Sequence, residues 1–163
     1  MIDDTGFKKD GASSPGVARQ YSGTLGKIGN CQIGVNIHVA TDTASCPVNW
    51  RLFIPESWDD TCAEPQEDAE RIQARREHSR LPDTARNQTK WSMGLEMIDQ
   101  LISWGLNPLP LVGDAGYGNA TGFRLGLTER HIAYVLAVTF STTAHPDNAS
   151  PETTSARPRL ARY

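Results

Sequence analysis

The chain has 163 residues, of which 38% are hydrophobic and 21% charged, and this predicts about one globular domain. Its formal net charge at pH 7 is −3, which argues against a protein that holds nucleic acid by overall charge, because Lys and Arg supply most non-specific affinity for phosphates. The cysteines form no Cys-x-x-Cys pair, so we expect reduced thiols and a cytoplasmic location. No apolar run approaches the length of a membrane span, about 20 residues.

Alternation of apolar with polar or small residues predicts strands in the first third of the chain. Residues 8–30 are rich in Gly, Ser and Lys and predict a loop or hairpin. A turn at residues 41–45 predicts that the strands on either side of it pair as an antiparallel hairpin. The predicted strands are residues 1–7, 31–39 and 48–54.

Residues 56–87 are rich in charged side chains, and within residues 64–80 five acidic residues nearly balance four arginines. We interpret this segment as a solvated helical excursion, supported by ion pairs between side chains four residues apart. Alternatively, its arginines face DNA. These arginines are Arg71, Arg75, Arg76 and Arg80.

The clearest helix is predicted at residues 90–104, with Thr89 near its start and Gly105 as its stop signal. Its apolar stripe at helical spacing contains Trp91, Leu95, Ile98 and Ile102. The elements expected next are a buried strand at 109–114, a Gly-rich turn at 115–119, a short helix at 121–130 and a strand at 133–138. We expect a domain of residues 1–140, followed by a flexible tail at 141–163, which is rich in Pro, Ser and Thr.

Strands that are followed by alternating helices and strands predict a mixed α/β sheet with flanking helices. Ligands and metals in such sheets bind near the carboxyl ends of strands. Asp4 and Asp114 are both expected at such ends, each before a Gly-containing turn. If their strands are neighbours, the two carboxylates lie about one strand spacing apart, roughly 5 Å. Asp3 competes with Asp4, but alternation along a strand points only one of them into the site.

A pair of carboxylates suits divalent-metal chemistry on phosphodiesters. Mg²⁺ and Mn²⁺ prefer hard oxygen ligands, and a two-metal site activates the attacking oxygen and stabilises the leaving oxygen. The histidines show no HExxH spacing, and the sequence contains no phosphate-binding P-loop. The residues alone leave a second interpretation open, because aspartates also form turns by accepting hydrogen bonds from their own backbone.

Several motifs occur in an order that narrows these alternatives. They are Asp3-Asp4-Thr5-Gly6, Thr89-Lys90-Trp91 and Asp114-Ala115-Gly116-Tyr117-Gly118, together with segments 16–23, 26–32 and 50–58. They resemble bacterial insertion-sequence transposases of the DDE superfamily endonuclease type, over roughly residues 1–145. The resemblance implies an RNase H-like fold and transposon DNA strand cleavage and transfer by an Asp, Asp and Glu triad that binds two divalent metals. The first two acids match Asp4 and Asp114, which are therefore expected as catalytic residues and as ligands of Mg²⁺ or Mn²⁺.

The chain also departs from the family pattern. Only Ile2 separates the first Met from the Asp-Asp pair, and the third acid of the family has no match, since Glu152 lies in no such motif. We therefore expect an RNase H-like core that is truncated at both ends. Such a fragment is predicted to bind one metal weakly and to be inactive in strand transfer.

The resemblance implies transposon-end DNA as a partner, a bacterial location near the nucleoid, and pairing with a second copy or an intact transposase. A basic surface near the first acid is expected to contact DNA phosphates, with a solvated hairpin as the alternative. Its residues are Lys8, Lys9, Arg19 and Lys27.

Three aromatic residues, Trp58, Trp91 and Tyr117, are interpreted as packing residues, and for Tyr117 a lid over the acidic site is the alternative. Two other functions stay open. One is a different metal-dependent phosphoester hydrolase, and the other is a non-catalytic remnant that binds DNA or a transposase.

Overall fold

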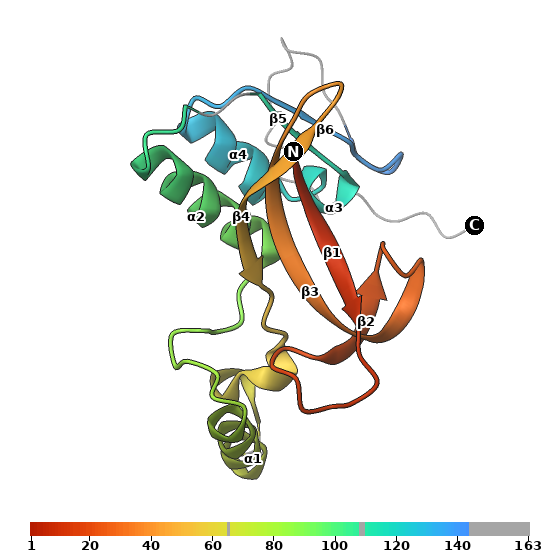
Figure 1. The fold of residues 1–163 in the computed structure, drawn as a ribbon, viewed down its shortest axis with the longest axis vertical. Coiled ribbons are helices and arrows are strands. Elements are labelled where there is room, and N and C mark those ends of the chain that lie inside the picture. The colour runs from red at the N-terminus through yellow and green to blue at the C-terminus, as the bar shows by residue number, and fades with distance from the viewer. Residues whose placement is uncertain (65, 108–109, 144–163) are drawn as a thin grey trace, which may run out of the picture.

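The computed structural model describes residues 1–64, 66–107 and 110–143. Within these residues, six strands form one sheet in the order β2-β3-β1-β5-β6, with β4 also paired to β3. Figure 1 shows α2 and α4 beside one end of the sheet and α1 at the opposite end of the molecule. The strands are β1 (Ile2–Lys8), β2 (Ala18–Ser22), β3 (Lys27–Ala40), β4 (Ser45–Leu52), β5 (Leu111–Gly113) and β6 (Tyr134–Leu136). The helices are α1 (Gln66–His78), α2 (Lys90–Ser103), α3 (Ala115–Gly118) and α4 (Thr121–Glu129), with short 3-10 helices η1 (Glu56–Trp58) and η2 (Asp60–Cys62).

The long strand β3 organises the sheet. β1 pairs with it antiparallel from Ile2↔Ile37 to Lys8↔Cys31, and β4 pairs with its second half. The predicted hairpin between the strands at 31–39 and 48–54 is therefore confirmed. For residues 8–30, the hairpin alternative is correct, because β2 folds back antiparallel onto the first residues of β3.

Helix α2 packs on the sheet face that carries Ile2. A Cβ atom at Gly94 would lie 2.6 Å from Cδ1 of Ile2, so glycine is what allows the helix to approach β1 this closely. Fully buried residues of α2 and α4, such as Met97, Phe123 and Leu127, complete this core. The predicted stripe of α2 therefore faces the sheet and α4, and the interpretation of Trp91 as a packing residue is confirmed by its contact with this cluster.

Both ends of α2 follow the predicted signals. The Thr89 hydroxyl oxygen accepts a hydrogen bond from the backbone N–H of Ser92 at 3.3 Å, which caps the first turn. Gly105 follows the helix with a φ of +82°, a conformation that glycine adopts without strain. The first residue of α2 is consequently fixed in place at Lys90.

The second half of the domain is built from parallel strands. β5 pairs with β1 through Ile2↔Gly113, and β6 pairs with β5 in parallel through three residue pairs. The expected strand at 109–114 is observed at Leu111–Gly113, and residue 109 lies outside the described residues. The predicted Gly-rich turn after it takes the form of a single helical turn, α3, which Asp114 caps.

Residues 56–87 differ from the prediction. The segment is helical as expected, but it is not simply solvated, since Trp58 is fully buried and packs with Val17 and Ile54 in a second apolar cluster. The guanidinium of Arg75 stacks 3.6 Å from the centre of the Trp58 ring. The packing interpretation of Trp58 is therefore confirmed, and Arg75 stabilises the fold.

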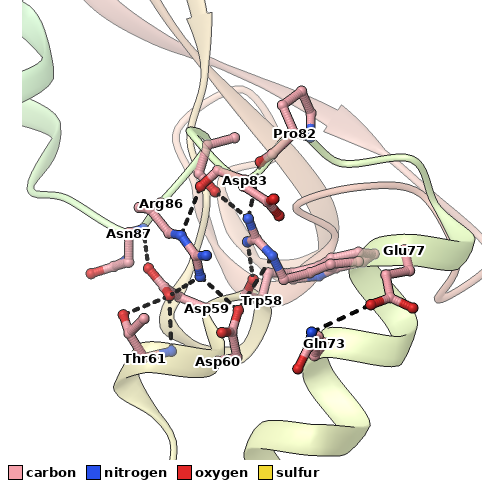
Figure 2. A network of polar contacts seen from close by, with 12 residues as sticks. Trp58, Asp59, Asp60, Thr61, Gln73, Glu77, Pro82, Asp83, Arg86 and Asn87 are labelled. Atoms are coloured by element: carbon pink, nitrogen blue, oxygen red, sulfur yellow. Dashed lines mark hydrogen bonds and ion pairs between the residues drawn. The ribbon is translucent and has the colours of Figure 1, made fainter.

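A polar network with Asp59 and Arg76 buried closes this second cluster, and we call it the arginine–aspartate cluster (Asp59, Asp60, Arg76 and Arg86). Figure 2 shows Arg86 between the two aspartates, at 3.1 Å from Asp59 and 2.6 Å from Asp60. Arg76 is only 3% exposed and donates to the carbonyl oxygens of Trp58, Pro82 and Ala85 at 2.6–3.0 Å. For Arg76, both the solvated and the DNA-facing interpretations are thus wrong.

Three further observations bear on the predictions. No helix in the described part of the chain is long and apolar enough to cross a membrane. The cysteines are free, with Cys31 buried and Cys46 and Cys62 exposed. The expected flexible tail at 141–163 falls largely outside the described residues, which end at residue 143.

Candidate active site

Asp4 lies within β1, not at its carboxyl end as predicted, because β1 continues to Lys8 through pairing with β3. The condition stated for the acidic pair, that the two strands are neighbours, is nevertheless met. The two strands run parallel and pair at Ile2↔Gly113, so Asp4 and Asp114 both follow the point where they meet. The parallel pairing of β1 with β5 therefore places the two acids beyond the same point of two neighbouring strands.

Alternation along β1 separates the two adjacent aspartates. The Asp4 side chain is 25% exposed and faces α2 and α3 through its hydrogen bonds, whereas Asp3 is exposed. Oδ1 of Asp3 accepts a hydrogen bond from the backbone N–H of Asp4 at 2.7 Å. Of the two candidates, Asp4 is thus the one directed toward Asp114 and its helix.

Asp114 directly follows β5 and caps α3. Its Oδ1 accepts hydrogen bonds from the backbone N–H groups of Gly116 at 2.9 Å and Tyr117 at 3.4 Å. The turn interpretation of this residue is therefore correct for one oxygen. The residue is exposed, and Oδ2 accepts no hydrogen bond from the described residues, so that oxygen is available to a ligand.

Tyr117 links the two acids. Its backbone N–H is held by Asp114, and its hydroxyl donates to Oδ1 of Asp4 at 2.5 Å. The ring is 3% exposed and packs against Phe123 with 5.5 Å between ring centres, so the packing interpretation is confirmed. Burial, followed by the nearby Asp4 carboxylate, raises the pKa of Tyr117 far above its usual value, which keeps the hydroxyl protonated as a donor.

Lys90 is a site residue for which the sequence analysis assigned no role. Its ammonium lies 2.5 Å from Oδ2 of Asp4 and 5.2 Å from the centre of the Phe53 ring. The two partners are 86 residues apart in sequence, so no local pattern reports their contact. The available signal was a lysine at the first position of a helix, where the helix dipole disfavours a cation. We call Asp4, Asp114, Tyr117 and Lys90 the carboxylate site.

The predicted basic residues lie further along the sheet. Lys8 ends β1 four residues after Asp4, a distance of about 13 Å along a strand. Arg19 and Lys27 are exposed on the β2–β3 hairpin, and Lys9 follows β1. Lys8 pairs weakly with Asp10 at 3.9 Å. A contact of these residues with DNA stays a prediction.

The donor atoms of the site suit a hard divalent cation in kind. Carboxylate oxygens are the ligands that Mg²⁺ prefers, and Asp4 and Asp114 offer them from neighbouring strands. Within the described residues, no group of three or more His, Cys, Asp or Glu side chains is placed to hold a metal. The acidic pair therefore fits part of a metal-binding set.

Comparison with known proteins identifies the family. The family model described as DDE superfamily endonuclease matches residues 1–163. No curated protein and no solved structure matches the chain. The mixed sheet with flanking helices agrees with the RNase H-like α/β fold expected from the resemblance. The chain belongs to the DDE superfamily endonucleases.

Proposed function

We propose that this protein acts in metal-dependent cleavage and transfer of DNA strands, with Asp4 and Asp114 as ligands of Mg²⁺ or Mn²⁺. The observation that carries the proposal is the parallel pairing of β1 with β5, after which each strand supplies one of the two acids. The hydrogen bonds of Tyr117 to both acids support a single site. Membership of the DDE superfamily endonucleases supports DNA as the substrate.

Each residue of the site has a defined task in this proposal. Tyr117 holds Oδ1 of Asp4, so Oδ2 is the oxygen that Asp4 offers to a metal. Asp114 uses Oδ1 to cap α3 and offers Oδ2. A bound divalent ion supplies charge stabilisation at the scissile phosphate and activates the attacking oxygen. Because β-strands and a capped helix carry these groups, the oxygens are held in place before DNA binds.

We propose transposon-end DNA as the substrate, with Lys8, Lys9, Arg19 and Lys27 contacting its phosphates. Lys8 ends β1, Lys9 follows it, and Arg19 and Lys27 lie exposed on the β2–β3 hairpin. Basic side chains of this kind bind a nucleic-acid backbone without reading its sequence. The overall charge of −3 makes a local surface of this kind necessary for DNA binding.

A second candidate function is binding of metal and DNA without strand cleavage. It is favoured by the absence of a third metal-binding side chain near Asp4 and Asp114 among residues 1–64, 66–107 and 110–143. A non-catalytic protein of this kind would act by occupying transposon ends or by pairing with an intact transposase.

The test measures Mn²⁺ binding by calorimetry and nicking of supercoiled plasmid with Mg²⁺ or Mn²⁺. The proposal expects both signals in the wild type, and loss of both in Asp4→Asn and Asp114→Asn. Asp3→Asn is the matched control, because this neighbouring carboxylate is exposed and does not face the site, so it should behave like the wild type.

The outcomes separate the candidates. Mn²⁺ binding that depends on Asp4 and Asp114, without nicking, supports the non-catalytic function. Nicking that persists in Asp4→Asn rejects the assignment of this residue. A wild type that binds no Mn²⁺ rejects both candidates.

A further inference from the structure

The first residue of α2, Lys90, carries a positive charge at the end of the helix where the helix dipole disfavours one. The N-terminal turn carries exposed N–H groups and partial positive charge, so acidic residues are favoured there and lysine is not. The first turn of α2 has no acidic residue and begins with Lys90. A residue that breaks a local rule in this way is often retained for function.

The positive charge of Lys90 is balanced by a carboxylate from another part of the fold, Asp4 on β1. It lies 2.5 Å from Oδ2 of Asp4, and the Phe53 ring lies 5.2 Å from it. The Thr89 cap fixes the backbone of this turn, so only the lysine side chain can move away. The side chains of Lys90 and Asp4 are 32% and 25% exposed, which leaves the pair accessible to ions and to a substrate from solvent.

The ammonium and a metal compete for the same oxygen. Oδ1 of Asp4 is held by the buried Tyr117 hydroxyl at 2.5 Å, which leaves Oδ2 as the oxygen for a cation. Mg²⁺ binds a carboxylate oxygen at about 2.0–2.1 Å, and its charge repels an ammonium in direct contact with that oxygen. Metal binding at Oδ2 therefore requires the Lys90 ammonium to leave.

We infer that Lys90 is an exchangeable counter-ion, which pairs with Asp4 in the metal-free protein and moves to a DNA phosphate when metal binds Asp4. This inference rests on the proposed function, since it assumes that Asp4 binds metal and that DNA is the ligand. The lysine side chain is flexible, and its ammonium binds a phosphate as a point charge. The exchange keeps a cation beside Asp4 in both states and links metal binding to DNA binding.

The first experiment measures Mn²⁺ affinity by calorimetry without DNA, in the wild type, Lys90→Met and Arg71→Met. Arg71 is 77% exposed on α1, at the other end of the molecule from α2, so its replacement removes one positive charge away from the site. Loss of the competing ammonium should tighten Mn²⁺ binding about fivefold in Lys90→Met, the range expected for a partly exposed ion pair and a nearby like charge. Arg71→Met should change the affinity by less than about twofold.

The second experiment measures binding of a duplex oligonucleotide with Ca²⁺ and with EDTA. Lys90→Met should weaken DNA binding about threefold to tenfold with Ca²⁺, as expected for the loss of one phosphate contact. It should have no effect in EDTA, where Lys90 pairs with Asp4. A purely structural role would weaken binding equally in both conditions, and this result would overturn the inference.

The two proposals fail in different ways. Mn²⁺ binding that is lost in Asp4→Asn but equal in Lys90→Met and Arg71→Met overturns the exchange and leaves the proposed function standing. Absence of Mn²⁺ binding in the wild type overturns both. Tighter Mn²⁺ binding in Lys90→Met without a Ca²⁺-dependent loss of DNA affinity rejects the phosphate as the second partner. Circular dichroism and thermal unfolding verify that each variant is folded.

Discussion

The arginine–aspartate cluster and the carboxylate site both join acids and bases from distant parts of the chain, but they hold their basic groups differently. Arg76 is 3% exposed and donates to three backbone carbonyls, whereas the Lys90 side chain is 32% exposed and has one acidic partner, Asp4. The first arrangement satisfies a buried charge from all sides. The second leaves a cation in contact with solvent, at a helix end that disfavours it.

The acidic residues of the two clusters also differ in how many of their oxygens are hydrogen-bonded. Asp59 is 1% exposed and accepts hydrogen bonds from Thr61, Arg86 and the backbone N–H of Asn87. Asp114 is exposed and uses a single oxygen for its cap. A fully bonded carboxylate contributes to the stability of the fold, whereas a carboxylate with an available oxygen can bind a ligand. We therefore expect substitutions in the first cluster to change stability, and substitutions in the second to change binding.

The largest stability effect is expected for Arg76→Met. The change removes the donors to the carbonyls of Trp58, Pro82 and Ala85 and the partner of Asp60 at 3.4 Å. Leaving such buried groups unpaired costs about 3–5 kcal/mol of the free energy of unfolding, which urea denaturation measures. Arg71→Met is the control, because its side chain is 77% exposed, and it should stay within about 0.5 kcal/mol of the wild type.

A loss below about 1 kcal/mol in Arg76→Met would contradict the contrast between the two clusters. The folded fraction of the same variant should bind Mn²⁺ like the wild type, because Arg76 has no contact with Asp4 or Asp114 among the hydrogen bonds and ion pairs of the described residues. A change in the metal affinity would show that the clusters are coupled.

The next effect is the pH dependence of stability through Asp59. Burial alone would raise the pKa of this carboxyl, but hydrogen bonds from Asn87, Thr61 and Arg86 outweigh burial and lower the pKa from 3.8 to about 2. Since the folded pKa is the lower one, the stabilisation is fully present above about pH 4 and is lost as the pH falls through 2. A shift of this size corresponds to about 2–3 kcal/mol.

Urea unfolding between pH 5 and pH 2 measures this contribution. Asp59→Asn should be less stable than the wild type at pH 5, and the difference should shrink as the pH falls. The exposed Asp42 provides the control variant Asp42→Asn, which should follow the wild-type curve. Parallel curves for the wild type and Asp59→Asn would show that this carboxylate does not carry the acid sensitivity.

The same contrast explains which features could be predicted from the sequence. The stripe of α2, its Thr89 cap and its Gly105 stop depend on residues within one helix, and all three predictions are confirmed. The alternation of β1 separated Asp3 from Asp4 for the same reason. The adjacency of β1 and β5 could only be stated as a condition, because a contact between Ile2 and Gly113 leaves no local periodicity.

Charged residues were the least predictable. Arg76 lies on a helix of mixed charge and resembles a solvated residue in sequence, and only the fold reveals the three carbonyls around it. Lys90 received no role because its partner lies 86 residues away. In both cases the sequence fixes the charge of the side chain, but tertiary packing decides whether that charge stabilises the fold or stays available.

The smallest expected effect on stability is that of Lys90→Met, which should change the free energy of unfolding by less than about 0.5 kcal/mol. Its ion pair with Asp4 is partly exposed and contributes little, and removing a cation from the start of α2 offsets part of the loss. Urea denaturation of Lys90→Met beside Arg51→Met, whose ion pair with Glu96 is similarly exposed, makes the comparison. A loss above about 2 kcal/mol in the free energy of unfolding would show that Lys90, like Arg76, is required for folding.

A Lys90→Met variant with nearly unchanged stability and tighter Mn²⁺ binding would show that the lysine lowers the metal affinity without stabilising the fold. This is the behaviour expected of an exchangeable counter-ion.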